Sequence, residues 1–217
     1  MEIEKFIERS PFLYHLTSKQ NAKSIIERKT LYSANALIDL STKKKDSEVK
    51  THKRFKHYPL DINGIEILLR DQRPISEIAL AKCLTDGWLV ADFLYHLNNR
   101  VFTWPNLDRL SRHFKRYANE EPVIFRFSSK EMILANPHVK FARLNTGATR
   151  PNSHLGGIAP ERGSKTFMKA SDYFLNVNTV AEVTFEKFCV IAGEYGIDKH
   201  PEGCFQKKNI VKTYSLA

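Results

Sequence analysis

What the sequence lacks excludes several classes of protein. It contains no run of eighteen apolar residues, so we expect no transmembrane helix. Its first residues, Met-Glu-Ile-Glu-Lys, do not have the apolar segment of a secretory signal peptide. The three cysteines, Cys83, Cys189 and Cys204, are an odd number without the spacing of a metal site, and nothing requires a disulfide. Together these features predict a cytoplasmic protein with no membrane partner.

Familiar catalytic motifs are missing as well. The histidines do not form the usual zinc pattern of two histidines on one helical face with a carboxylate, so we expect no metal. There is no Gly-x-Ser-x-Gly motif of the α/β-hydrolases. The run Gly163-Ser-Lys-Thr166 lacks the upstream glycine spacing of a phosphate-binding P-loop. These absences argue against a metalloenzyme, a serine hydrolase and a P-loop nucleotidase.

The length and composition suit one domain with a core of its own. The chain has 217 residues, of which 42% are hydrophobic. We therefore expect a single domain over residues 1–217, with a basic loop at 41–58 and a helical insertion at about 76–98. Short strands and helices are mixed without regular alternation, which favours an α+β fold over a doubly wound parallel sheet.

Positive charge is the most pronounced feature of the composition. Lys and Arg number 34 against 24 Asp and Glu, which gives a formal net charge of +10. A surface of this sign attracts polyanions. The excess is concentrated in the stretch 41–58 and in a second group made of Arg109, Arg112, Lys115 and Arg116. Each group is either a solvated surface or part of a track for nucleic acid.

Hydrophobic periodicity and capping residues predict the main elements. Ser18, Ser33, Asn106 and Ser128 each precede a helical pattern, so we expect each of them to cap a helix. The glycines and prolines between 144 and 165 predict a long functional loop. The expected strands are 12–17, 100–104, 123–127, 179–185 and 188–191, and the expected helices include 18–29, 33–40, 77–85 and 88–98.

The first strand carries the most informative side chains. His15 and Thr17 are two residues apart and therefore project from the same face of the strand. Asn21 follows in the first turn of the next helix. A ring nitrogen, a hydroxyl and the backbone amides of a helix start are groups that bind ribose and phosphate. This arrangement suits a nucleotide; the alternative is that His15 is a half-buried histidine at the edge of a sheet.

Two later strands complete a recognisable order. They are Asn99-Arg-Val-Phe-Thr-Trp104 in the middle of the chain and Val180-Ala-Glu-Val-Thr-Phe185 near its end. With the strand of His15, these segments resemble the ADP-ribosyltransferase superfamily, in particular the DarT-type nucleic-acid transferases and the related tRNA 2′-phosphotransferases. The resemblance spans most of the chain. It implies an ADP-ribosyltransferase-like split β-sheet core with peripheral helices, and NAD as the substrate.

The resemblance also implies which residues surround NAD. The early strand and helix would hold the ribose and the phosphates. Two aromatic rings and a cation on one face of the middle strand would stack nicotinamide and pair with phosphate, unless the rings simply belong to the core. Arginines after residue 69 would lie near the pyrophosphate, although the first could instead pair with Asp71 or Glu66. The expected NAD-binding residues are His15, Thr17, Asn21, Arg70, Arg73, Arg100, Phe102 and Trp104.

A carboxylate in the late strand is the expected catalytic residue. Glu182 lies within a hydrophobic strand, where a charged group either faces solvent or takes part in chemistry. By resemblance it would accept a hydrogen bond from the 2′-hydroxyl of the nicotinamide ribose and stabilise the positive charge that develops at C1′. It would also be placed to act as a base toward the acceptor. Glu186, on the same strand face, is the alternative.

The resemblance implies the transfer of ADP-ribose from NAD to a DNA or RNA acceptor, in the role of a toxin or phage-defence effector with an antitoxin partner. Two alternatives remain open: a non-enzymatic nucleic-acid-binding module on the same scaffold, and an NAD-dependent RNA 2′-phosphotransferase-like enzyme. Basic side chains of the 41–58 stretch and of the glycine-rich loop would bind the acceptor. The expected acceptor-binding residues are Lys43, Lys44, Lys45, Lys53, Arg54, Arg150 and Arg162.

Overall fold

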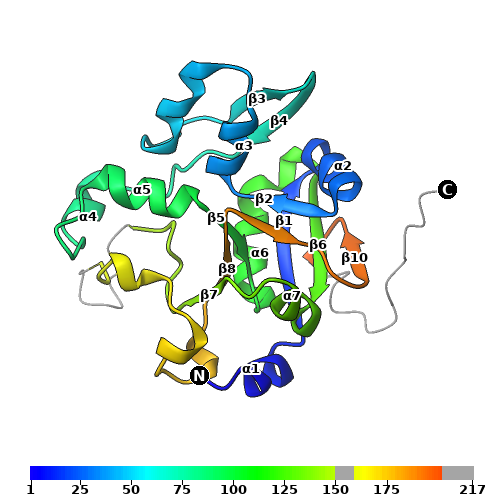
Figure 1. Cartoon of the computed structure of the whole chain (residues 1–217), viewed down its shortest axis with the longest axis vertical. Helices are drawn as coiled ribbons and strands as arrows, with labels where there is room; N and C mark the ends of the chain where they lie inside the picture. The colour runs from blue at the N-terminus through cyan, green and yellow to red at the C-terminus, as the bar shows by residue number, and fades with distance from the viewer. Residues whose placement is uncertain (150–158, 202–217) are drawn as a thin grey trace.

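The computed structural model describes residues 1–149 and 159–201, and its mixture of helices and antiparallel strands agrees with the predicted α+β class (Figure 1). The helices are α1 (Ile3–Arg9), α2 (Lys19–Arg28), α3 (Ala34–Leu40), α4 (Glu77–Ala81), α5 (Val90–Asn98), α6 (Leu107–Tyr117) and α7 (Ser129–Ala135). The strands are β1 (Phe12–Ser18), β2 (Thr30–Tyr32), β3 (Tyr58–Ile62), β4 (Ile65–Leu69), β5 (Arg100–Thr103), β6 (Pro122–Ser128), β7 (Val139–Ala142), β8 (Glu182–Glu186), β9 (Phe188–Val190) and β10 (Tyr195–Asp198). Short 3-10 helices are η1 (Lys44–Lys50), η2 (Ala118–Glu120), η4 (Ser164–Thr166), η5 (Ala170–Asp172) and η6 (Val177–Thr179).

Two three-stranded antiparallel sheets form the framework. In the first, β6 lies between β1 and β10; in the second, β8 lies between β5 and β7. The sheets meet where β5 ends, because Tyr14 of β1 and Trp104 exchange two backbone hydrogen bonds of 2.9 and 2.8 Å. This junction brings His15, the residue after Tyr14, beside β5.

Alternation along the strands gives the second sheet a core face and a site face. The main core joins the two sheets and includes Leu13, Val101, Phe125, Phe127, Phe141, Val183 and Phe185. Phe102 and Thr184 are cross-strand partners in the β5–β8 pair, and they point to the opposite face. Glu182, two residues before Thr184, shares that face. The core therefore fixes the strand from which the predicted catalytic carboxylate projects.

A smaller unit is built on the β3–β4 hairpin. Its turn uses Asn63 and Gly64, whose φ angles of 54° and 78° lie in the left-handed region. The hairpin packs on α3 around a core of its own, made of Ile38, Leu60, Ile62, Ile67 and Leu69. In Figure 1 the hairpin and α3 lie together at the top of the view. The unit supplies β4 as one wall of the cavity described below.

The stretch 41–58 differs from the expected irregular loop, since it contains η1 and ends at the start of β3. Asp46 is buried, with 2% of its surface exposed. Its carboxylate accepts hydrogen bonds from the hydroxyls of Ser41 and Tyr58. A buried carboxylate held in this way gives the segment a defined backbone path. Hydrophobic periodicity does not reveal such an anchor.

The predicted helix caps are confirmed. At the start of α2, α3, α6 and α7, the side chain of the residue before the helix accepts a hydrogen bond from a backbone amide of the first turn. Such a bond satisfies one of the free amides at a helix start, which is why these residue types mark helix boundaries. The capping residues are Ser18, Ser33, Asn106 and Ser128.

Other boundaries differ from the sequence-based expectation. The helix expected at 77–85 ends at Ala81, because Cys83 and Thr85 form backbone hydrogen bonds with Arg162 instead. The strand expected at 179–185 begins at Glu182, after η6. The sequence analysis did not predict α1 or β10.

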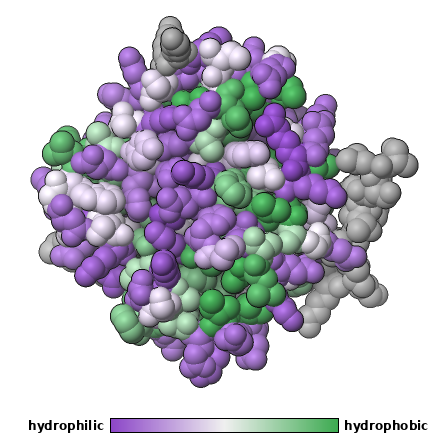
Figure 2. Space-filling view, viewed as in Figure 1, coloured by the Kyte–Doolittle hydropathy of each residue, from purple (hydrophilic) through white to green (hydrophobic). Residues whose placement is uncertain are grey.

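The surface agrees with the composition. Figure 2 shows a largely hydrophilic face, interrupted by smaller hydrophobic patches. None of the described helices is both long and apolar enough to cross a bilayer.

Asn136 provides a test of how the helix α7 is fixed to β9. Its side chain is fully buried and bonds to both backbone groups of Val190 at 2.8 and 2.9 Å. Asn136→Ala should lower the free energy of unfolding by about 2 kcal/mol, because it removes the hydrogen bonds of the buried amide to the backbone of Val190 and Met132. Urea denaturation measures the change. Asn119→Ala, at an exposed site, is the control and should change stability by less than about 0.5 kcal/mol. Equal stabilities of Asn136→Ala and Asn119→Ala would contradict the account.

Candidate functional site

A cavity of about 520 Å³ lies among the junction of the two sheets, the β3–β4 hairpin and α6. Its wall is formed by β1, α2, β4, β5, α6, β8 and the segment 145–148. Segments far apart in the sequence therefore meet at one place. The sequence-predicted residues that line the cavity are His15, Thr17, Asn21, Arg54, Arg70, Arg100, Phe102, Trp104 and Glu182.

His15 presents a hydrogen-bond acceptor to this cavity. Its Nδ1 lies 2.8 Å from the carbonyl oxygen of Phe102. A carbonyl only accepts, so Nδ1 carries the proton and Nε2 has the free lone pair. Burial, together with the nearby Arg70, lowers the pKa of His15 to about 4. His15 is therefore neutral at pH 7, and its Nε2 suits a hydroxyl donor such as that of a sugar.

Glu182 is buried, with 3% of its surface exposed. Both the backbone N–H and the hydroxyl of Thr146 donate to its Oε2, at 3.2 and 2.7 Å. Burial raises the pKa of Glu182 to about 7, although the Thr146 donors and the cations Arg109 and Arg162 oppose the rise. Near neutral pH this carboxyl group therefore exists in both the ionised and the protonated form.

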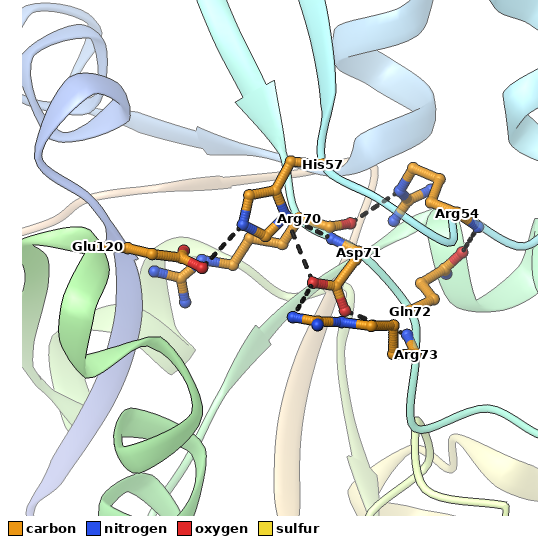
Figure 3. Close-up of polar contacts among 7 residues, drawn as sticks. All are labelled: Arg54, His57, Arg70, Asp71, Gln72, Arg73 and Glu120. Carbon is orange, nitrogen blue, oxygen red and sulfur yellow. Dashed lines mark hydrogen bonds and ion pairs between the residues drawn. The ribbon is translucent and has the colours of Figure 1, made fainter.

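Arg70, directly after β4, and Arg54 lie next to each other at the cavity. The guanidinium of Arg70 lies over the ring of Tyr117, with 4.1 Å between its central carbon and the ring centroid. Its Nη1 and Nη2 are buried and have no hydrogen-bond partner among the described residues. Arg54 donates from Nε to the carbonyl oxygen of Arg70 at 2.9 Å (Figure 3). Its Nη1 donates to Oδ1 of Asn98 at 3.0 Å. Arg54 is thus held in place, while Arg70 keeps donors that nothing in the described chain uses.

Arg73, predicted to lie near a pyrophosphate, does not line the cavity. Its side chain is 61% exposed and pairs with Asp71 at 3.0 Å. The backbone N–H of Asp71 donates to Nδ1 of His57, whose Nε2 in turn donates to Glu120 at 3.0 Å (Figure 3). The proposed alternative pairing of Arg70 with Asp71 is therefore replaced by a pair between Asp71 and Arg73. The network ties the residues after β4 to η2, which directly follows α6.

Helix α6 adds a row of cations that was not assigned to the site from the sequence. Arg109, Arg112 and Arg116 line the cavity together with His113. Burial, with Arg70 and Arg116 nearby, lowers the pKa of His113 to about 3, so this ring is neutral. The cavity thus combines many guanidinium groups with few acids, which favours an anionic ligand. Its arginines are Arg54, Arg70, Arg100, Arg109, Arg112 and Arg116, and its acids are Asp71 and Glu182.

The middle strand serves both the core and the cavity. Phe102 packs edge-on against Phe167, with 6.0 Å between the ring centroids, and Trp104 lies 4.7 Å from His113. Arg100 is buried and forms an ion pair of 3.3 Å with Glu186. Glu186 does not line the cavity, which favours Glu182 over Glu186 as the working carboxylate.

Two of the predicted NAD-binding side chains, those of Asn21 and Thr17, have little freedom to bind a ligand. The amide of Asn21 exchanges two hydrogen bonds of 2.8 and 2.9 Å with the backbone of Leu68, so it joins α2 to β4. Thr17 is buried at 5% exposure. Asn21 therefore shapes the cavity wall, and its amide is not available in this arrangement for a phosphate.

The predicted acceptor-binding residues are not gathered at one place. Lys43 and Lys53 do not line the cavity. The side chains of Lys44 and Lys45, and the whole of Arg150, lie outside the described residues. The expectation for Arg162 needs correction, because its side chain is almost completely buried and donates to backbone carbonyl groups. The guanidinium of Arg162 donates all its hydrogen bonds within the protein and is therefore not available at the surface for an acceptor.

A family model, described as a family of unknown function (DUF7002), matches residues 11–189. The chain belongs to this family. Every residue that lines the cavity, from His15 to Glu182, falls within the matched segment, so the cavity lies in the part of the chain that defines DUF7002. No curated protein and no solved structure matches the chain.

Sequence reasoning missed several cavity residues of this DUF7002 protein. The arginines of α6 were recognised as a basic group, but only the packing of the helix places them at the cavity. The sequence did not indicate Thr146 as a site residue, because a threonine in a glycine-rich loop belongs to no recognisable motif. Among the described residues, no cluster of three or more histidines, cysteines or acids could hold a metal ion.

The raised pKa of Glu182 predicts how stability depends on pH. In the unfolded chain its pKa returns to 4.5, so the folded state binds the proton more tightly. Its contribution is full below pH 4.5 and is lost as the pH rises through about 7. Glu182→Gln should therefore be more stable than the wild type at pH 8, by up to roughly 3 kcal/mol.

Urea denaturation of both proteins at pH 4.5 and pH 8 measures this difference, which should shrink at the lower pH. The exposed Glu121→Gln serves as the control and should behave like the wild type at both values. A Glu182→Gln protein that is less stable than the wild type at pH 8 would contradict the assignment of a buried, unfavourably ionised carboxyl group.

Proposed function

We propose that this DUF7002 protein transfers ADP-ribose from NAD to a nucleic-acid acceptor. The observation that carries the proposal is the convergence of His15, Arg70 and Glu182 in one cavity, although they come from β1, the end of β4 and β8, which are far apart in the sequence. Along the chain, the strand of His15, the strand of Phe102 and the strand of Glu182 follow one another in the order that the resemblance to ADP-ribosyltransferases implies.

The arginines supply the binding energy for the diphosphate of NAD. Guanidinium groups bind phosphate oxygens through two parallel hydrogen bonds. Arg70 has two terminal nitrogens without a partner among the described residues, and the arginines of α6 lie on the same cavity. A diphosphate is the anion that would satisfy these donors and offset the crowded positive charge.

His15 positions a ribose of NAD. Its protonated Nδ1 is fixed by the carbonyl of Phe102, so Nε2 can accept a hydrogen bond from a ribose hydroxyl. A charged imidazolium would lack this acceptor, and the low pKa of His15 prevents that form at pH 7. The ring thus binds by accepting a hydrogen bond and does not compete with the arginines for phosphate.

Glu182 acts on the nicotinamide ribose. In its ionised form it accepts a hydrogen bond from the 2′-hydroxyl and stabilises the positive charge that develops at C1′. The C1′–N bond breaks, and its electron pair leaves with nicotinamide. A nucleophilic atom of the acceptor then bonds to C1′ and releases its proton. The products are ADP-ribosylated acceptor, nicotinamide and a proton.

Charge supports nucleic acid as the acceptor. Arg112 and Arg116 are exposed as well as cavity-lining, so they border the mouth of the site. The net charge of +10 adds a general attraction for polyanions. The direct experiment incubates the protein with radiolabelled NAD and separate pools of DNA, RNA and protein. Label in DNA or RNA supports the proposal; intact NAD and no labelled pool would refute it.

The role of Glu182 is tested by Glu182→Gln, which keeps the shape and loses the charge. Transfer should fall about a hundredfold or more, as when other preorganised electrostatic groups are removed. NAD affinity should change much less, because the charge matters mainly after nicotinamide begins to leave. Transfer is followed by labelled product and affinity by calorimetry. A folded variant with near-normal transfer would move the role to Glu186.

The acceptor surface is tested with the double variant Arg112→Ala and Arg116→Ala. Its binding to an oligonucleotide should weaken, and the slope of log affinity against log salt should fall by about one for each phosphate that is no longer neutralised. Fluorescence anisotropy at several salt concentrations measures this slope. The control removes two exposed lysines elsewhere, Lys82→Ala and Lys130→Ala. Equal slopes for both double variants would assign the arginines of α6 to plain solvated surface.

A further inference from the structure

Arg162 is among the largest fully buried side chains of the protein, with 2% of its surface exposed. Its Nη1 donates to Pro160 at 2.7 Å, and its Nη2 donates to Ala148 at 2.8 Å and to Asn145 at 3.4 Å, in each case to the carbonyl oxygen. Nε donates to the carbonyl oxygen of Thr146 at 3.4 Å, and Nη1 also lies 3.7 Å from the sulfur of Cys83. All five N–H groups of the guanidinium therefore have an acceptor within the protein.

These contacts hold one side of the segment 145–148, and the other side faces the site. Three consecutive or near-consecutive carbonyl groups, those of Asn145, Thr146 and Ala148, point to Arg162. From the same segment, the N–H and the hydroxyl of Thr146 both donate to Oε2 of Glu182. The other carboxylate oxygen, Oε1, has no hydrogen-bond partner among the described residues, and Glu182 lines the cavity. The segment thus determines which oxygen of Glu182 is free.

We propose that Arg162 is a positioning residue of the site: it holds the backbone of 145–148 so that both donors of Thr146 meet Oε2 of Glu182 and Oε1 stays free for the ligand. The inference rests on the proposed function in taking Glu182 as the catalytic carboxylate. The positioning itself does not depend on NAD and is measured without it.

The chemistry of arginine explains the choice of residue. A guanidinium offers five donors in a planar fork, whereas lysine offers three donors from one nitrogen and cannot span carbonyl groups on several residues. A buried cation also acts on Glu182 through its charge. Arg162 and Arg109 of α6 are the cations that favour the ionised form of Glu182, and the Thr146 donors act in the same direction. Arg162 therefore affects Glu182 both directly and through Thr146.

The test is the titration of Glu182 followed by the ¹³C signal of its carboxyl carbon, assigned by comparison with Glu182→Gln. In the wild type the midpoint should lie at about 7. Thr146→Val removes the hydroxyl donor, and Arg162→Lys keeps a charge but releases the carbonyl groups; each should raise the midpoint to about 8 or above. Thr146→Ser restores the hydroxyl and should return the midpoint to that of the wild type. Arg143→Lys, an exposed site near the segment, is the matched control and should leave it unchanged.

A folded Arg162→Lys protein with the wild-type midpoint would overturn the proposal, as would equal midpoints for Thr146→Val and Thr146→Ser. If Arg162→Lys does not fold at 25 °C, the titration is repeated at low temperature with a stabilising osmolyte. A variant that folds under neither condition would assign Arg162 a purely structural role. If the midpoints move as expected but no ADP-ribose is transferred, the inference stands and the proposed function falls.

Discussion

The junction between β1 and the end of β5 is the constraint on which the site depends. Tyr14 and Trp104 exchange backbone hydrogen bonds there, and the ring of the next residue, His15, bonds to the carbonyl of Phe102. The junction joins two small sheets that also share an apolar core. Because β8 pairs with β5, it also places Glu182 on the wall of the same cavity as His15. Through it, β1 and β8, which belong to separate sheets, border the same cavity.

Burial and charge act together inside this cavity. Burial and nearby arginines keep His15 and His113 neutral, with pKa values of about 4 and about 3. The same burial raises the pKa of Glu182, and the Thr146 donors and the cations Arg109 and Arg162 oppose that rise. A cavity that gathers cations and buries a carboxyl group lowers the stability of the empty protein. This pattern is typical of functional sites, where stability is given up for ligand binding.

Features that depend on neighbouring residues in the sequence could be predicted well. The caps of α2, α3, α6 and α7 were correct because a capping bond spans only a few residues. The faces of β1 and β8 followed from strand alternation, and this alternation is why His15 and Glu182 could be singled out before the structure was known.

Features that depend on distant partners could not be predicted. Asn21 was expected to bind phosphate, but its amide is matched to the backbone of Leu68, 47 residues away. Arg162 was expected at the acceptor, but carbonyl groups of 145–148 enclose it. The helix expected at 77–85 was shortened by the same arginine, whose backbone pairs with Cys83 and Thr85. In each case a polar group is satisfied by a partner that only the tertiary fold brings near.

Calorimetric titration of the purified protein with NAD tests the central claim most directly, namely that the arginine-lined cavity binds NAD. The account predicts one NAD per chain and at least about tenfold weaker binding for Arg70→Gln, since this variant lacks the buried guanidinium that would bind a phosphate. The exposed Arg143→Gln should bind like the wild type. The absence of binding heat at millimolar NAD, together with an unchanged melting temperature, would contradict the account.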